Sequence, residues 1–284
     1  MRLDDQRESG NVEDRRGVGG LGGGIRIGGG IGGVILLLLA LVLGVDPGLL
    51  LDVQQGQSPT NPPISAPGGE DAQKRFVAQV LGSTEDVWRG VFRQNGAQYE
   101  DPKLVLFTGA VDSGCGLTSA AVGPFYCPRD RRVYLDLDFF RSMQTRLGAG
   151  GGDFARAYVI AHEVGHHVQT LLGITGRVQA ARPRLSDTQN NALSVRVELQ
   201  ADCLAGVWAN RANDARGILE RGDIEQGLAT AAAIGDDRLQ RRARGYAVPD
   251  SFTHGSSTQR VRWFRRGLQT GDLRQCDTFA ADAL

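Results

Sequence analysis

The chain has 284 residues, no formal net charge, 41% hydrophobic residues and 23% charged residues. An ordinary apolar fraction without net charge excludes a wholly disordered protein, and the lack of a basic excess argues against bulk electrostatic binding to nucleic acid. Two features depart from an average composition. The 40 glycines are clustered, and three of the four histidines fall together at His162, His166 and His167.

The first 69 residues differ in composition from the rest of the chain. Residues 1–26 are charged and then glycine-rich, which predicts a tail with little to pack. Residues 27–45 carry no charge, and a helix of that length spans about 28 Å, close to the thickness of a bilayer core. We therefore expect a transmembrane helix there, with a cleaved signal peptide or a buried soluble helix as the alternatives. Residues 46–69 hold half of the prolines and predict an extended linker.

The distribution of arginine predicts an orientation for the apolar stretch. Positive residues precede the stretch, whereas residues 46–73 contain neither lysine nor arginine. The preceding arginines are Arg2, Arg7, Arg15, Arg16 and Arg26. Because positively charged flanks stay on the cytoplasmic side, we expect a single-pass protein of the cell membrane with a cytoplasmic N-terminus and an extracytoplasmic domain.

Residues 70–284 predict one α+β domain, mostly helical, in which a small sheet precedes the helices. Apolar residues at helical spacing predict a helix over residues 70–81, and Thr84 is expected to cap a second short helix. Residues 103–108 and 132–137 have the composition of strands. Everything after Gly152 is predicted to be helical.

The four cysteines, at 115, 127, 203 and 276, indicate disulfides if the domain is extracytoplasmic. Pairing Cys115 with Cys127 and Cys203 with Cys276 is the simplest of the three possible connectivities. Four buried free thiols are the alternative. None of the cysteines belongs to a Cys-x-x-Cys pair, which argues against a thiolate zinc site.

The segment His-Glu-Val-Gly-His at 162–166 is the chemical centre of the sequence. A helix is expected from Asp153, as its N-cap, to Gly173, with an apolar stripe along one face. His162 and His166 lie one turn apart on the other face, within reach of a single metal ion, and Glu163 can meet a water on that ion. His167 is out of register and is not counted as a ligand. The alternative is a surface helix with incidental histidines.

The third ligand has to come from another part of the chain, since catalytic zinc sites use three protein ligands and keep one position open. Glu198 and Asp202 lie four residues apart on a predicted helix. This arrangement resembles that of gluzincins, which implies that Glu198 binds zinc and that Asp202 hydrogen-bonds to His162 or His166. The two acids could exchange these roles, or could simply solvate a helix face.

His254 precedes another predicted helix and is a candidate donor to the developing oxyanion of peptide hydrolysis. Its alternatives are capping that helix or packing against Trp263. Four tyrosines are rival donors that the sequence does not rank. They are Tyr126, Tyr134, Tyr158 and Tyr246.

Seven stretches of the chain together resemble the bacterial neutral zinc metallopeptidase family, which is expected to be membrane-anchored. They are TEDVW (84–88), GPFYCP (123–128), VYLDLDFF (133–140), HEVGHHVQ (162–169), ELQADCLAG (198–206), GDD (235–237) and HGSSTQR (254–260). The resemblance implies a zincin-like fold, Zn²⁺ as cofactor and a peptide or protein substrate, without specifying which one.

These observations predict a membrane-anchored zinc metallopeptidase. In the expected mechanism Glu163 is the general base for a zinc-activated water that attacks the peptide bond. An extended substrate could pair with residues 122–127 or 132–137 as an added strand. The alternatives are a membrane-tethered zinc-binding or scaffold protein without catalytic activity, and a zinc hydrolase that cleaves another amide. No nucleic acid partner is expected.

Overall fold

The computed structural model of the protein describes residues 1–4, 6–16, 69–147, 151–281 and 283–284. The expected transmembrane helix at 27–45 and nearly all of the proline-rich linker lie outside these residues. Within them, no helix combines the length and the apolar character needed to cross a bilayer.

A four-stranded sheet forms one side of the domain. Its strands lie in the order β1 (Val12–Asp14), β2 (Lys103–Phe107), β6 (Arg132–Asp136) and β5 (Phe125–Cys127). The first three run parallel, and β5 is antiparallel to β6. The strands expected at 103–108 and 132–137 are confirmed as β2 and β6, whose apolar residues are buried.

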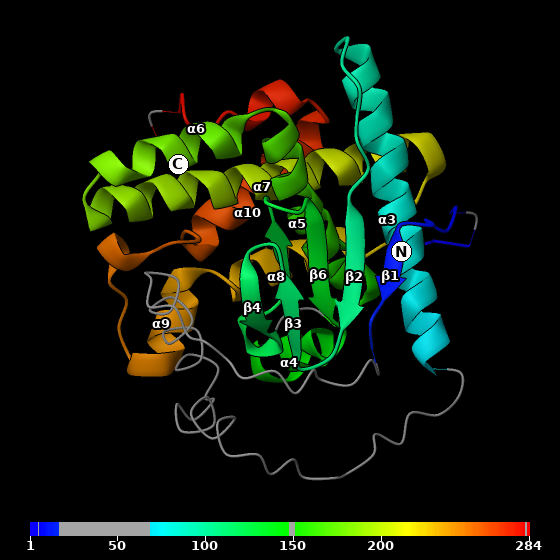
Figure 1. Ribbon diagram of the computed structural model, residues 1–284, viewed down its shortest axis with the longest axis horizontal. Coiled ribbons are helices and arrows are strands. Elements are labelled where there is room, and N and C mark those ends of the chain that lie inside the picture. The colour runs from blue at the N-terminus through cyan, green and yellow to red at the C-terminus, as the bar shows by residue number, and fades with distance from the viewer. Residues whose placement is uncertain (5, 17–68, 148–150, 282) are drawn as a thin grey trace.

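The N-terminal segment was expected to be a tail, but residues 1–16 pack against the domain. Within this segment β1 pairs with β2 in register, with Val12 opposite Leu104. Figure 1 shows β1 between β2 and α3 (Gly69–Gln94). The folded unit therefore includes residues that precede position 70.

The helix α3 runs without interruption through the position where a second helix was expected to begin. Thr84 is not an N-cap. It is buried inside α3, and its hydroxyl donates a hydrogen bond to the Leu81 carbonyl of the preceding turn. Burial of this face, which includes Trp88, holds the helix together across Gly82 and Ser83.

A separate hairpin of β3 (Ala110–Ser113) and β4 (Gly116–Ser119) precedes β5. A disulfide between Cys115 and Cys127 joins its tip to the end of β5. The second disulfide, Cys203–Cys276, links the middle of α7 (Asp187–Arg216) to the turn η4 (Leu273–Cys276) near the C-terminus. Both predicted pairings are confirmed.

The rest of the described chain is helical, as expected for an α+β domain whose sheet comes first. The α-helices are α4 (Asp138–Leu147), α5 (Asp153–Leu171), α6 (Ile174–Ala181), α7 (Asp187–Arg216), α8 (Asp223–Ala233), α9 (Asp236–Arg244) and α10 (Ser257–Thr270). The 3₁₀ turns are η1 (Ala120–Val122), η2 (Arg182–Arg184), η3 (Pro249–Ser251) and η4 (Leu273–Cys276).

The helix α5 lies at the centre of the domain. It packs against α3, α7 and α8 and against strands β5 and β6. Its N-cap is Gly152 rather than Asp153, which occupies the first turn and pairs with Arg156. Its predicted end is confirmed, because Gly173 adopts the left-handed conformation that follows many helices.

Close packing between α7 and α10 depends on two glycines. A Cβ on Gly206 would overlap the Phe264 carbonyl, and one on Gly267 would overlap the Cys203 carbonyl. The two helix backbones can therefore approach each other, which brings the start of α10 next to the middle of α7.

Candidate metal centre

The two histidines of the His-Glu-Val-Gly-His segment lie on one face of α5. The ring centroids of His162 and His166 are 4.8 Å apart, and the ring planes are nearly perpendicular. His162 is buried and His166 is half-buried, since the surrounding helices cover this part of α5. The spacing of four residues places the two imidazoles side by side, as expected from the sequence.

Glu198 of α7 completes a group of three potential ligands. One carboxylate oxygen lies 3.1 Å from His162 Nε2 and the other lies 3.6 Å from His166 Nε2. The ligand atoms of all three residues lie within 4.8 Å of one another. The structure therefore brings His162, His166 and Glu198 together, and it places Glu198 rather than Asp202 in this group.

Gly165 allows α5 and α7 to come close at this point. A Cβ on Gly165 would lie 3.0 Å from the Ala201 carbonyl oxygen and 3.2 Å from the Ala201 Cα. A side chain here would be in tight contact with the α7 backbone, which would have to shift by a few tenths of an ångström. The glycine inside the segment is thus part of the reason that a residue of α7 reaches the two imidazoles.

Hydrogen bonds to the other ring nitrogens orient both imidazoles. His162 donates through Nδ1 to Asp202 at 2.9 Å, and His166 donates through Nδ1 to the Gln169 side-chain oxygen at 2.8 Å. Because each Nδ1 donates to its acceptor oxygen, both Nε2 atoms face Glu198, and loss of the Nε2 proton would leave a lone pair there for a metal ion. Asp202 therefore contacts His162, one of the two histidines proposed for it.

Asp202 is held by Arg260, which was not predicted from the sequence, and by Tyr158, which was predicted only as a rival donor to the substrate. Arg260 of α10 donates two hydrogen bonds to its carboxylate, at 2.8 and 2.9 Å, and the Tyr158 hydroxyl donates another. Burial opposes the charged form of Asp202, but Arg260 and His162 outweigh burial and lower the pKa of the carboxyl to about 2. Burial lowers the pKa of His162, but the carboxylates of Asp202 and, to a lesser extent, Glu198 outweigh burial and raise it to about 10.

A series of hydrogen-bonded side-chain amides orients the His166 ring. The Gln169 side-chain nitrogen donates to the Val197 carbonyl and to Gln200. Gln200 in turn donates to the Cys276 carbonyl, next to the disulfide. Gln169 follows His166 by three residues on one helix, which is the sequence signal that could have identified it.

Glu163 is buried with 8% of its surface exposed, and its carboxylate has no hydrogen-bond donor among the described residues. Burial raises its pKa, although the charges of His166 and His162 oppose the increase. A buried carboxylate with an elevated pKa, next to two potential metal ligands, has the properties of a general base.

His254 lies in the loop before α10, close to Glu198. Gly255 packs against Val195 and Leu199, on either side of Glu198 along α7. One oxygen of Asp236 accepts the backbone N–H groups of residues 253–255, and the other lies 3.2 Å from His254 Nδ1.

The surroundings of His254 favour its charged form. Burial lowers the pKa of His254, but Asp236 and Glu198 outweigh burial and raise it. Its Nε2 has no partner in the described part of the chain. Capping of α10 is carried out by Ser256 instead, whose side chain accepts the Gln259 N–H.

The remaining candidates from the sequence have other roles. His167 is buried and donates from Nε2 to the Glu100 carbonyl at 2.7 Å, so it is excluded from the metal-ligand group as expected. The rival tyrosines are also accounted for, since three of them hydrogen-bond elsewhere and the fourth is exposed. Tyr126 contacts His167, Tyr134 donates to Asp130, Tyr158 donates to Asp202 and Tyr246 is 60% exposed.

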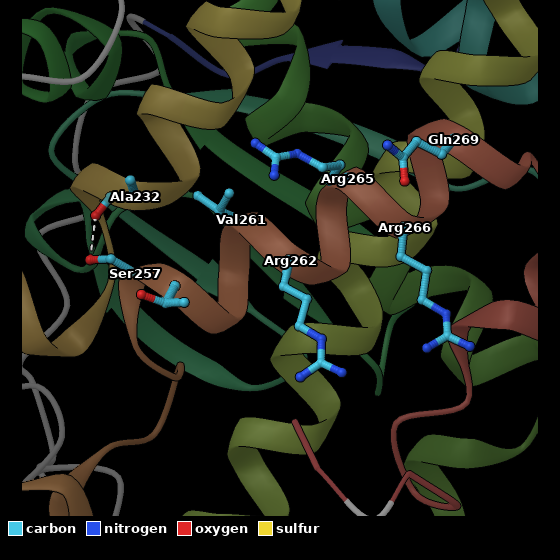
Figure 2. A pocket seen from close by; sticks show the side chains of 8 residues that line it. Ala232, Ser257, Val261, Arg262, Arg265, Arg266 and Gln269 are labelled. Atoms are coloured by element: carbon cyan, nitrogen blue, oxygen red, sulfur yellow. Dashed lines mark hydrogen bonds between the residues drawn. The ribbon is translucent and has the colours of Figure 1, made fainter.

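A surface cavity of about 500 Å³ lies along α10, apart from this group of residues. Its lining includes Arg262, Arg265 and Arg266, all exposed. Figure 2 shows the Arg265 guanidinium pointing away from those of Arg262 and Arg266. The three charges therefore do not converge on a common ligand position.

Comparison with known proteins gives one family and several relatives. The family model described as "Putative neutral zinc metallopeptidase" matches residues 1–279, and so includes the N-terminal segment. The uncharacterized protein YpfJ of Escherichia coli K12 is 49% identical over 287 residues, covering 98% of this chain and 99% of its own length. The uncharacterized protein Rv2575 of Mycobacterium tuberculosis H37Rv is 43% identical over 262 residues, 85% of each chain. No solved structure matches.

Proposed function

The chain belongs to the neutral zinc metallopeptidase family, and from this premise we propose that it hydrolyses peptide bonds with a metal held by His162, His166 and Glu198. The observation that carries the proposal is the convergence of two imidazole Nε2 atoms and one carboxylate from separate helices. Zinc sites of catalytic type use such a set of three ligands.

The residues present fit a zinc ion. Two imidazoles and a carboxylate are ligands that zinc accepts, and both imidazoles are oriented through Nδ1 by an acceptor oxygen, from Asp202 or Gln169. When bound there, zinc supplies Lewis acidity, which acidifies a water and polarises the scissile carbonyl.

In this proposal Glu163 moves the proton. Its raised pKa makes it a stronger base than an exposed carboxylate. It takes the proton of the attacking water and delivers it to the departing amine nitrogen. The absence of a competing hydrogen-bond donor among the described residues leaves its oxygens available for this transfer.

His254 is proposed to donate a hydrogen bond from Nε2 to the oxygen on which negative charge develops. Asp236 fixes the loop through three backbone N–H groups, and its charge raises the pKa of the His254 imidazole against the effect of burial. In this arrangement Asp236 is a positioning residue, since it acts through His254.

The edge strand β5 is the proposed docking site for the substrate backbone. Of the two segments considered from the sequence, 132–137 forms β6, which is already paired on both sides by β2 and β5. The strand β5 is at the edge of the sheet and packs against α5. An extended peptide could therefore add to β5 and pass over the helix that carries Glu163.

The test is the variant Glu163→Gln in the zinc-loaded full-length chain. We expect it to retain the zinc content of the wild type and to lose cleavage of a peptide library, because the amide cannot accept the proton. Gln179→Ala, at an exposed position on α6, is the control and should cleave normally. Full-rate cleavage by Glu163→Gln would refute the mechanism, and the absence of cleavage by the zinc-loaded wild type would favour a binding protein instead.

A further inference from the structure

Residues 1–16 form an extended segment that crosses the outside of α3 and ends as a strand of the sheet. At its start, the Arg2 backbone N–H donates to the Ile218 carbonyl beyond the end of α7. Leu3 is buried in the main core. At its end, β1 pairs with β2. The segment thus contacts three separate parts of the domain.

A buried carboxylate on α3 depends on this segment. The Glu85 side chain is fully buried. Its oxygens accept hydrogen bonds from Arg7 Nη2 at 2.6 Å, from the Ser9 hydroxyl and from the Asn11 amide at 2.8 Å. A carboxylate is almost never fully buried unless it is paired, and the hydrogen bonds recorded for Glu85 come from the N-terminal segment.

The surface of α3 is shaped to receive the segment. The Ser9 N–H donates to the Ala78 carbonyl at 2.9 Å. A Cβ on Gly82 would overlap the Arg7 carbonyl, so only glycine allows this close approach. By contrast, a Cβ on Gly90 of the same helix would meet no atom within 4 Å.

The two described chain ends that flank residues 17–68 lie next to each other. Asp14 of β1 and Lys74 near the start of α3 form an ion pair at 3.5 Å. The described segments on either side of residues 17–68 therefore contact each other.

We infer that residues 1–16 and the metal centre are parts of one folded body and lie on the same side of any membrane. A single crossing between residues 16 and 69 would place β1 and β2 on opposite sides of the bilayer, which their pairing forbids. The described segments that precede and follow residues 17–68 therefore lie in one compartment. If β1 of one copy paired instead with β2 of a second copy, the two strands would still have to lie on the same side of the membrane.

This inference accounts for four of the five arginines that suggested a cytoplasmic N-terminus, and the fifth, Arg26, lies outside the described residues. Arg7 binds Glu85, Arg15 pairs with Glu13, and Arg2 Nη2 donates to the Gly217 carbonyl. Arg16 pairs with Asp14. These side chains serve the fold, so their count is no measure of membrane orientation.

The first experiment compares the accessibility of the two parts in cells. Two full-length variants, Glu8→Cys in the segment and Tyr246→Cys in the domain, place a thiol at exposed positions. They are treated with a membrane-impermeant maleimide before and after permeabilisation, with the wild type as background. We expect both thiols to label in the same condition. Labelling of one thiol only in intact cells and of the other only after permeabilisation would overturn the inference.

The second experiment tests the packing itself by hydrogen exchange of the amides at 12–14 in the full-length chain. These amides should be protected in the wild type and in Gly90→Ala, and should lose protection in Gly82→Ala, where the new methyl group displaces Arg7. Absence of protection in the wild type, or unchanged protection in Gly82→Ala, would contradict the inference.

Discussion

Arg260 and Asp202 form a buried ion pair in which two guanidinium nitrogens face the two carboxylate oxygens, Nε to Oδ2 at 2.8 Å and Nη2 to Oδ1 at 2.9 Å. This pair links α10 to α7 and stands directly behind His162. The orientation of one imidazole of the metal centre therefore depends on a helix near the C-terminus.

Removing the arginine should cost stability. Arg260→Met leaves Asp202 charged and buried without its main partner, which typically costs about 3–5 kcal/mol. Urea denaturation of the metal-free chain measures the loss. Arg262→Met, at an exposed position on the same helix, should change the free energy of unfolding by no more than about 0.5 kcal/mol. Equal effects of the two substitutions would contradict the proposed role of Arg260.

The amide behind His166 should matter for metal affinity. Gln169→Leu removes the acceptor of His166 Nδ1, so the ring is free to turn and zinc should bind about 10–100-fold more weakly. Competition with a chelator of known affinity measures the change. Gln179→Leu on the exposed side of α6 is the control, and the prediction fails if both variants bind zinc like the wild type.

The pH dependence of cleavage should report on His254. Its pKa is raised, so the imidazolium persists to higher pH than an ordinary histidine, and kcat/KM should fall only as pH rises through this elevated pKa. Asp236→Asn removes a negative charge and should move this basic limb to lower pH. His254→Ala should abolish the limb and lower kcat/KM most at pH values below it. An unchanged basic limb in both variants would exclude His254 as the donor.

Acid should destabilise the metal-free chain through its buried carboxylates. The folded-state pKa of Asp202 is about 2 and that of Asp236 is also lowered, against an ordinary value of 3.8. Their contribution to stability is therefore fully present above pH 3.8 and is lost as pH falls through the folded-state values. Urea denaturation between about pH 5 and about pH 2 should show this loss, and it should be smaller in Asp236→Asn. An equal loss in the variant would rule out a contribution from Asp236.

The two disulfides should contribute unequally. Cys203 and Cys276 are separated by 73 residues and Cys115 and Cys127 by 12. Closing a longer loop removes more entropy from the unfolded chain, so replacing the first pair by serine should cost about 4 kcal/mol and the second about 3 kcal/mol. Thermal unfolding of the two double variants compares them, and the reverse order would contradict this reasoning.

The sequence was sufficient to identify those parts of the site that depend on local spacing. His162 and His166 follow from a helical repeat of four residues, and the pairing of Glu198 with them follows from the resemblance to gluzincins. Gln169 and Arg260 escaped notice for different reasons. Glutamine is common in helices, so nothing marks Gln169 as special. Arg260 is one of 32 basic residues, and its burial follows only from the packing of α7 against α10.

The N-terminal segment shows why the remainder of the fold was not predictable. The strand β1 has three residues, two of them acidic, and no alternation of apolar and polar side chains. Its pairing is set by distant partners, Glu85 and Gly82 on α3 and the open edge of β2. Secondary-structure propensity depends on residues that are neighbours along the chain. This strand is specified instead by a surface made of residues much later in the sequence.

The central claim is that His162, His166 and Glu198 hold one catalytic metal. Its most direct test is the zinc content of the purified full-length chain, wild type against Glu198→Ala, with circular dichroism to establish that both are folded. We expect roughly one zinc per chain in the wild type and little or none in the variant. Equal zinc content in the two folded proteins would contradict it.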